Sequence, residues 1–169
     1  MAAYRKAGFE LPVVYYPRLL LLRLVDLTEP GNSFPRHQFH GADVPLLEQE
    51  SDYSTAARAA YQATLRLMAD HARAAGWPET ILYLTDEPGL KGWTEWETAL
   101  SYGLARETCP ELKTFCTIYE PPLQELYGKL FDYVSAQGLR TAAPRAFNTA
   151  MLTACRNTGS QLWASCWPG

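Results

Sequence analysis

Helical and strand-like segments alternate along most of this chain, and that alternation restricts the folds open to it more than any other feature. Apolar residues recur at helical spacing through 53–75, with Asp52 as the expected N-cap and Gly76 as the expected C-cap. The short apolar run TILYLT, residues 80–85, follows as a buried strand. Further helices are predicted at 94–109, at 121–129 and from Pro144 to before Gly159, and further strands at 11–16, 112–119, 130–135 and 161–167.

Strict alternation of this kind predicts an α/β fold in which helices cover a parallel sheet. An open doubly wound sheet and part of a (β/α)8 barrel, or TIM barrel, both satisfy the pattern. No glycine-rich phosphate loop follows any of the strands, so the nucleotide-binding version of the open sheet lacks its usual signature. We therefore predict a partial TIM barrel with about five parallel strands and with helices on its outer side.

The two ends of the sequence favour a slice of a longer barrel. Residues 3–8, AYRKAG, are typical of the last turn of a helix, and the strand-like segment 161–167 reaches Pro168 without a covering helix. About five strand units are present, whereas a closed barrel needs eight. The expectation is that 1–169 forms an interior slice of one catalytic domain, that the missing barrel strands belong to the parent chain, and that 28–51 is a long loop or insertion.

Composition and charge argue against two classes of partner. The 169 residues carry a net charge of −3 and their Lys and Arg residues are scattered, so a basic face for nucleic acid is not expected. The apolar run at 19–27 contains Arg23 and Asp26 and is far too short to span a bilayer, so no membrane partner is expected either. The first residues lack a secretory signal, which leaves open whether the parent protein is secreted, periplasmic or cytoplasmic.

The cysteines and histidines predict neither a metal site nor a cofactor. The four cysteines form no CxxC pair, so buried free thiols are expected rather than zinc ligands. His37 and His40 are spaced HxxH in a segment with Pro and Gly, and the expectation is two surface loop histidines without a third ligand. A metal-dependent hydrolase, in which Asp86 or Glu87 joins one of these histidines, would require that loop to fold back onto the strand end.

Asp86 and Glu87 stand side by side where the apolar strand 80–85 stops, and Pro88 follows at once. In barrel enzymes the loops after the C-terminal strand ends form the active face, so catalytic groups are expected at this position. Neighbouring strand residues point to opposite faces, so both carboxylates reach one cleft only if the strand bends or bulges. Pro88 favours an extended Glu87. Packed close together, one carboxyl would stay charged and the other protonated. The structural alternative is a solvated strand end in which Asp86 caps a turn.

A long helix, a Gly-Trp turn, ILYLTDEP and a second helix followed by Pro-x-LKTFCT together resemble glycoside hydrolase family 123 and related barrel domains, over residues 52–169. The sharpest motif is DEP at 86–88. The resemblance implies retaining, substrate-assisted cleavage of a terminal β-N-acetylhexosamine, which is N-acetylgalactosamine in that family. It implies Glu87 as the acid/base and Asp86 as the group that orients and charge-stabilises the 2-acetamido group. The alternative is a noncatalytic carbohydrate-binding or structural barrel domain.

Four further residues are candidates for binding the carbohydrate substrate. Glu120 is the other acid at a strand end, and Tyr119 is a candidate donor to the acetamido oxygen or else a barrel-layer aromatic or strand cap. Trp163 and Trp167 are candidates for a sugar platform, with core packing as the alternative. Their strand, QLWASCW, contains no carboxylate, which agrees with a mechanism that uses the acetamido group of the substrate instead of an enzyme nucleophile.

Overall fold

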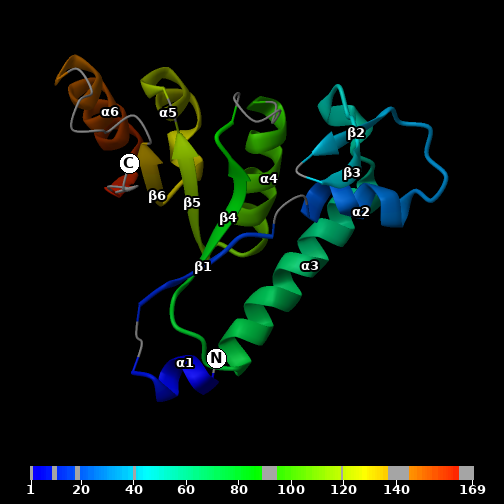
Figure 1. Ribbon diagram of the computed structural model, residues 1–169, viewed down its shortest axis with the longest axis horizontal. Helices are drawn as coiled ribbons and strands as arrows, with labels where there is room; N and C mark the ends of the chain where they lie inside the picture. The colour runs from blue at the N-terminus through cyan, green and yellow to red at the C-terminus, as the bar shows by residue number, and fades with distance from the viewer. Residues whose placement is uncertain are drawn as a thin grey trace.

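The computed structural model describes residues 2–8, 11–17, 20–39, 41–88, 95–118, 120–136 and 145–163. Their main feature is a five-stranded, fully parallel sheet with the strand order β1-β4-β5-β6-β7 (Figure 1). The strands therefore lie next to one another in the order in which the chain reaches them. Their bounds are Val13–Tyr15 for β1, Thr80–Asp86 for β4, Lys113–Ile118 for β5, Tyr133–Ala136 for β6 and Gln161–Trp163 for β7.

Helices connect the successive strands and stand side by side in the same order (Figure 1). Parallel crossovers are right-handed in about 98% of cases, and a strand order that never reverses then places every crossover on the same face. The predicted α/β fold, with five parallel strands flanked by helices, is confirmed, and it is consistent with a partial barrel. From β4 onward the connecting helices are α4 (Glu95–Thr108), α5 (Pro121–Tyr127) with the 3₁₀ turn η2 (Gly128–Leu130), and α6 (Arg145–Thr158).

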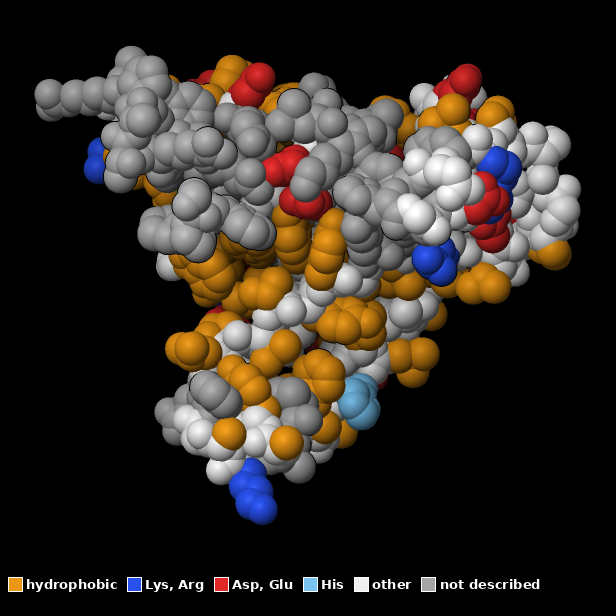
Figure 2. All heavy atoms as spheres, in the orientation of Figure 1, with side chains coloured by type: hydrophobic (Ala, Val, Ile, Leu, Met, Phe, Trp, Pro, Cys, Tyr) orange, Lys and Arg blue, Asp and Glu red, His pale blue; other side chains and the backbone are white. Residues whose placement is uncertain are grey.

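The two faces of the sheet differ in burial. Leu82, Cys116 and Val134 point toward the helices and have no exposed surface. Burial of one such aliphatic side chain stabilises a fold by roughly 1.5–3 kcal/mol, so this side carries the core. Tyr83 and Phe115 point to the opposite, inner face and are only half-buried. Figure 2 shows hydrophobic side chains across the middle of the molecule, where the strands lie, and acidic side chains at the upper margin of this region.

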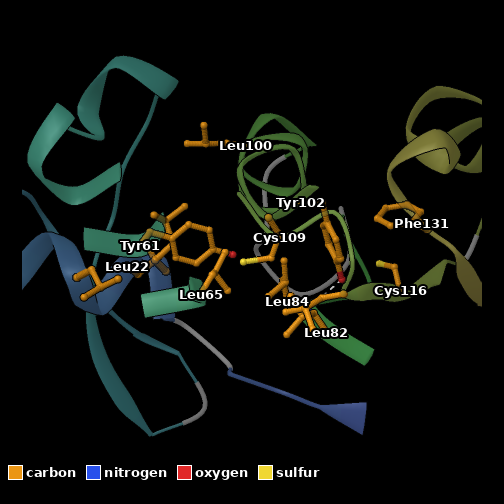
Figure 3. Close-up of a cluster of buried hydrophobic side chains, with 14 of the residues drawn as sticks. Leu22, Tyr61, Leu65, Leu82, Leu84, Leu100, Tyr102, Cys109, Cys116 and Phe131 are labelled. Carbon is orange, nitrogen blue, oxygen red and sulfur yellow. Dashed lines mark hydrogen bonds between the residues drawn. The ribbon is translucent and has the colours of Figure 1, made fainter. Parts of the chain in front are cut away.

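A second part of the core lies between α2 (Leu20–Thr28) and α3 (Thr55–Ala74). Leu22 of α2 lies beside Tyr61 and Leu65 of α3, and all three are buried (Figure 3). This packing orients α3 at the side of the sheet, where it also contacts α4.

The start of α3 differs from the prediction by two residues. Ser54 is the N-cap, and its Oγ accepts a hydrogen bond from the backbone N–H of Ala57 at 3.1 Å. Asp52 as the N-cap is therefore wrong. Its carboxylate instead accepts the N–H groups of Glu48 and Gln49, because a 3₁₀ turn, η1 (Glu50–Asp52), precedes the helix and needs its own cap.

Residues 28–51, predicted as a long loop or insertion, hold a small antiparallel hairpin of β2 (Arg36–Phe39) and β3 (Ala42–Pro45). Arg36 forms ion pairs with Asp26 of α2 and Asp43 of β3, which tie the hairpin to the helix. His37, predicted in a surface loop, lies in β2, since the backbone of RHQF pairs with that of ADVP. His40 lies outside the described residues.

The N-terminal region and the edges of the sheet complete the fold. A short helix, α1 (Ala2–Lys6), agrees with the helical turn predicted at 3–8, and the Tyr4 hydroxyl donates to the carbonyl of Leu11. Within the described ranges, neither the outer edge of β1 nor that of β7 pairs with another strand. Among the same residues, no helix is both long enough and apolar enough to cross a bilayer.

Candidate functional site

The end of β4 contains a bulge, which lies between Tyr83 and Asp86. Tyr83 pairs with Phe115 of β5, yet the next paired position on β4 is Asp86, opposite Thr117. Three steps along β4 therefore match two steps along β5, which is the definition of a bulge. Its effect is to bring Asp86 onto the same inner face as Tyr83. A regular strand would have placed these two residues on opposite faces.

Asp86 lies in a compact hydrogen-bonded cluster with Tyr83 and Thr117. The Tyr83 hydroxyl donates to Asp86 Oδ1, and the Thr117 hydroxyl donates to the same oxygen at 2.8 Å. The two hydroxyl oxygens are also within hydrogen-bond distance of each other. Burial and the hydrogen bond to Asp86 raise the pKa of Tyr83, so this hydroxyl stays protonated and serves as a donor. Donors fixed in this way favour a charged carboxylate and hold its orientation.

Glu87 is buried directly after the bulge, with 6% of its surface exposed. Its backbone N–H donates to Thr117 Oγ1 at 3.2 Å, so Thr117 contacts both members of the acidic pair. The φ angle of Glu87 is 51°, in the left-handed region, and the extended conformation predicted from Pro88 is therefore wrong. The bulge and the bond to Thr117 outweigh the preference set by Pro88. A non-glycine residue in this conformation costs about 1–3 kcal/mol, and such strain is concentrated at functional sites.

Aromatic rings form a layer on the inner face just below the Asp86 cluster. Tyr16 stacks on Tyr83 with ring centroids 4.5 Å apart, and Tyr83 contacts Phe115 at 5.0 Å. Phe115 contacts Trp163 at 5.7 Å, and Trp163 contacts Tyr133 at 4.4 Å. The layer thus crosses the sheet from the end of β1 to β7. Barrel interiors are usually filled by branched aliphatic residues, so this face is unusually aromatic for a packed interior.

Trp163 belongs to the same inner face as Asp86 but not to its immediate surroundings. The register runs from Asp86 to Thr117, then to Ser135, then to Trp163. Three strand spacings of about 4.8 Å separate the first and last of these, or about 14 Å along the sheet. The Trp163 ring nevertheless reaches across β6 to Phe115, so the structure places it in the aromatic layer.

Sequence reasoning missed three polar residues of this face. Tyr83 and Thr117 contact Asp86 directly, and Ser135 lies next to Thr117 in register. The Ser135 hydroxyl is buried and finds no hydrogen-bond partner among the residues that the structure describes. The alternating pattern of 112–119 was the available signal for Thr117, because it sets Thr117 on the face of Phe115.

The remaining candidates for substrate binding are Glu120, Tyr119 and Trp167. Glu120 is exposed at the C-terminal end of β5 and is the N-cap residue of α5, without a side-chain capping bond. It therefore shares the edge of the sheet with the acidic pair. Tyr119 and Trp167 lie outside the described residues.

Metal and thiol chemistry find no support in the described ranges. These ranges contain no group of three or more His, Cys, Asp or Glu residues able to hold a metal ion. Cys109, Cys116 and Cys155 are free and buried, as predicted. Cys116 lies closest to the bulge, and burial raises its pKa to about 12, so it remains a thiol and not a nucleophilic thiolate.

Comparison with known proteins finds no family model that matches the chain and no curated protein of significantly similar sequence. The resemblance to glycoside hydrolase family 123 therefore stays a prediction.

Proposed function

We propose that Asp86 and Glu87 are the catalytic pair of a glycoside hydrolase site for terminal β-N-acetylhexosamine, N-acetylgalactosamine being the expected sugar. The observation that carries the proposal is the bulge of β4. It sets Asp86 on the inner face at a C-terminal strand end, fixed by two hydroxyl donors, with a buried acid next to it in the chain. This is the end of the strand at which barrel enzymes hold their catalytic groups.

The two acids have different roles in the proposed reaction. The 2-acetamido oxygen of the substrate attacks the anomeric carbon, and the bond to the leaving oxygen breaks while Glu87 gives that oxygen a proton. Asp86 orients the acetamido group and stabilises the positive charge that develops on its nitrogen. Water then attacks the anomeric carbon of the cyclic intermediate, the bond between that carbon and the acetamido oxygen breaks, and the Glu87 carboxylate takes a proton from the attacking water. The substrate thus provides the nucleophile, which most retaining glycosidases supply as a second carboxylate.

Several features of the inner face support a carbohydrate ligand. Tyr83 and Phe115 present half-buried rings below Asp86, and aromatic faces suit the apolar faces of sugar rings. The Tyr83 hydroxyl and the Thr117 hydroxyl keep the Asp86 carboxylate in place before substrate arrives, which is the preorganisation that charge stabilisation requires.

A noncatalytic carbohydrate-binding or structural domain is the second candidate. The aromatic layer favours it, because Tyr16 already stacks on Tyr83 and packing of these rings needs no reaction. We propose that turnover requires further strands to close the barrel and supply the remaining active-face loops. The 169-residue chain by itself is then expected to bind the sugar weakly and to hydrolyse p-nitrophenyl N-acetylhexosaminides very slowly. Robust turnover by this chain would reject the requirement for closing strands.

The test is a pair of NMR titrations, with N-acetylgalactosamine and with galactose. The acetamido sugar should shift the amide signals of Asp86 and Thr117 saturably, with a Kd in about the millimolar range, whereas galactose should not. Asp86→Asn should abolish the difference between the sugars. Asp132→Asn, which changes a carboxylate at the opposite end of the sheet, should preserve it. Equal binding of both sugars, or of neither, would contradict the proposal.

A further inference from the structure

Tyr102 of α4 fills the bulge of β4 with its hydroxyl group. The side chain is fully buried and points from the helix layer to the strands, between Leu84 and Cys116 (Figure 3). The hydroxyl oxygen accepts the backbone N–H of Leu84 at 3.0 Å and that of Thr85 at 3.2 Å. The hydroxyl proton is donated to the carbonyl of Phe115 on the next strand, at 2.7 Å.

These contacts use the full hydrogen-bonding capacity of one phenol. A tyrosine hydroxyl has one proton to donate and two lone pairs to accept with, and Tyr102 employs all three. A bulge disrupts the ladder of hydrogen bonds between strands, and buried N–H groups without a partner are strongly disfavoured. Leu84 and Thr85, the two bulged residues, obtain their partner from the helix instead of from β5.

The bulge could be removed by a slip of one residue, and the slip would undo the site. In a regular strand Asp86 would point to the face opposite Tyr83, away from the Tyr83 and Thr117 hydroxyls. The contacts of Tyr102 oppose this slip, since a regular ladder with β5 would occupy one of the two N–H groups that its hydroxyl accepts.

We propose that Tyr102 is a positioning residue for Asp86: its hydroxyl holds the bulge of β4 and thereby places Asp86 beside Tyr83 and Thr117. The importance of Tyr102 for catalysis rests on the proposed function. Its effect on the bulge and on the position of Asp86 does not depend on that function, and the test of this effect needs no substrate.

The test compares Tyr102→Phe with Tyr61→Phe. Both tyrosines are buried, and the Tyr61 hydroxyl also bonds to a backbone carbonyl of α4, that of Ser101, so both variants lose a buried hydroxyl and both should have lower urea midpoints. Two local readouts report on the site. One is the slowly exchanging hydroxyl proton of Tyr83 in the NMR spectrum, assigned by its loss in Tyr83→Phe. The other is protection of the Glu87 amide from hydrogen exchange, referenced to the core amide of Val134.

Tyr102→Phe should lose the Tyr83 hydroxyl signal and should lower the relative protection of Glu87 by about ten-fold or more. Tyr61→Phe should keep both. Retention of both in Tyr102→Phe, despite its lower stability, would overturn the proposal, as would absence of the Tyr83 signal from the unchanged chain. If Tyr102→Phe does not fold, hydrogen exchange of the Leu84 and Thr85 amides is measured in the unchanged chain instead. Fast exchange of either amide would also overturn the proposal.

Failure of the Tyr102 proposal can be distinguished from failure of the proposed function. Intact local signals with no preference for the acetamido sugar would reject the glycosidase proposal and leave Tyr102 as the residue that shapes the strand end. A sugar preference that survives Tyr102→Phe unchanged would reject the positioning role alone.

Discussion

Thr117 Oγ1 lies 2.8 Å from Asp86 Oδ1, so a hydroxyl of one strand fixes the carboxylate of the next. Thr117 Oγ1 also accepts a hydrogen bond from the backbone N–H of Glu87. One side chain therefore links the strained backbone of Glu87 to the orientation of Asp86. Neither acid is held by its own strand alone, and the geometry of the pair depends on β5 as much as on β4.

Thr117→Val should weaken binding of the acetamido sugar by about ten-fold, because the variant keeps the shape of the side chain but removes both hydrogen bonds. NMR titration with N-acetylgalactosamine measures the change. Thr114→Val is the matched control, since Thr114 is also buried on β5 but its hydroxyl donates to the carbonyl of Leu130 at the opposite end of the strand. A Thr117→Val chain that binds as tightly as the unchanged chain would show that the cluster does not orient Asp86 for the ligand.

Glu87→Gln and Asp86→Asn should respond differently to the leaving group once the barrel is complete. Glu87→Gln removes the proton donor, a loss of roughly 10²–10⁴ in rate for poor leaving groups, and the loss should shrink for leaving groups that need no proton. Asp86→Asn removes charge stabilisation and should be equally harmful across the series. Steady-state rates with a set of aryl glycosides measure how the rate of each variant depends on the leaving group. A covalent sugar adduct trapped on Glu120, or on any other carboxylate of the chain, would replace this mechanism with the two-carboxylate one.

Gly128→Ala should destabilise the α5–α6 side of the molecule. A Cβ at this position would lie 2.2 Å from Gln124 Nε2 and 2.6 Å from Thr158 Oγ1. Gln124 is fully buried and donates to Thr158 and Ser160, so it has little freedom to move aside. The expected cost is about 1–3 kcal/mol in the free energy of unfolding, measured with urea. Gly103→Ala in α4 meets nothing within 4 Å and should stabilise by about 0.5–1 kcal/mol. Equal effects of the two variants would contradict the packing described.

Asp132 should make the stability of the sheet depend on pH. Its burial disfavours the charged form, but hydrogen bonds from the backbone and hydroxyl of Thr114 and the charges of Arg106 and Lys113 outweigh burial and lower its pKa. A lowered pKa in the folded state contributes stability above the unfolded value of about 3.9, and the contribution is lost as pH falls through the folded pKa.

Asp132→Asn should therefore cost about 1–3 kcal/mol at pH 7, and the difference from the unchanged chain should shrink as the pH falls below about 4. Urea unfolding at pH 7, 4 and 2.5 measures it. The exposed Asp70, which pairs with Arg73 on the surface of α3, provides the control, and Asp70→Asn should change stability by less than about 0.5 kcal/mol. A pH-independent difference for Asp132→Asn would show that its carboxylate does not carry this stability.

Most of the fold could be predicted from the sequence because it depends on local patterns. The strand predicted at 80–85 is observed at Thr80–Asp86, and the helix predicted at 94–109 is observed at Glu95–Thr108. The alternation of helix and strand predicts parallel pairing because a helical crossover returns the chain in the same direction. Asp52 and Ser54 could not be ranked as N-caps, because both are good capping residues and only the 3₁₀ turn decides between them.

By itself, the sequence determined the alternating elements and the position of Asp86 and Glu87 at a strand end, and it predicted a bend or bulge there. Only the tertiary structure decided how that bulge is held and what surrounds it. The Tyr102 hydroxyl comes from a helix and the Thr117 hydroxyl from the next strand, so neither contact leaves a local pattern in the chain. The left-handed Glu87 was likewise not predictable, since its neighbour Pro88 favours another conformation. It is stabilised by contacts with residues distant in sequence, and such contacts exist only once the sheet has formed.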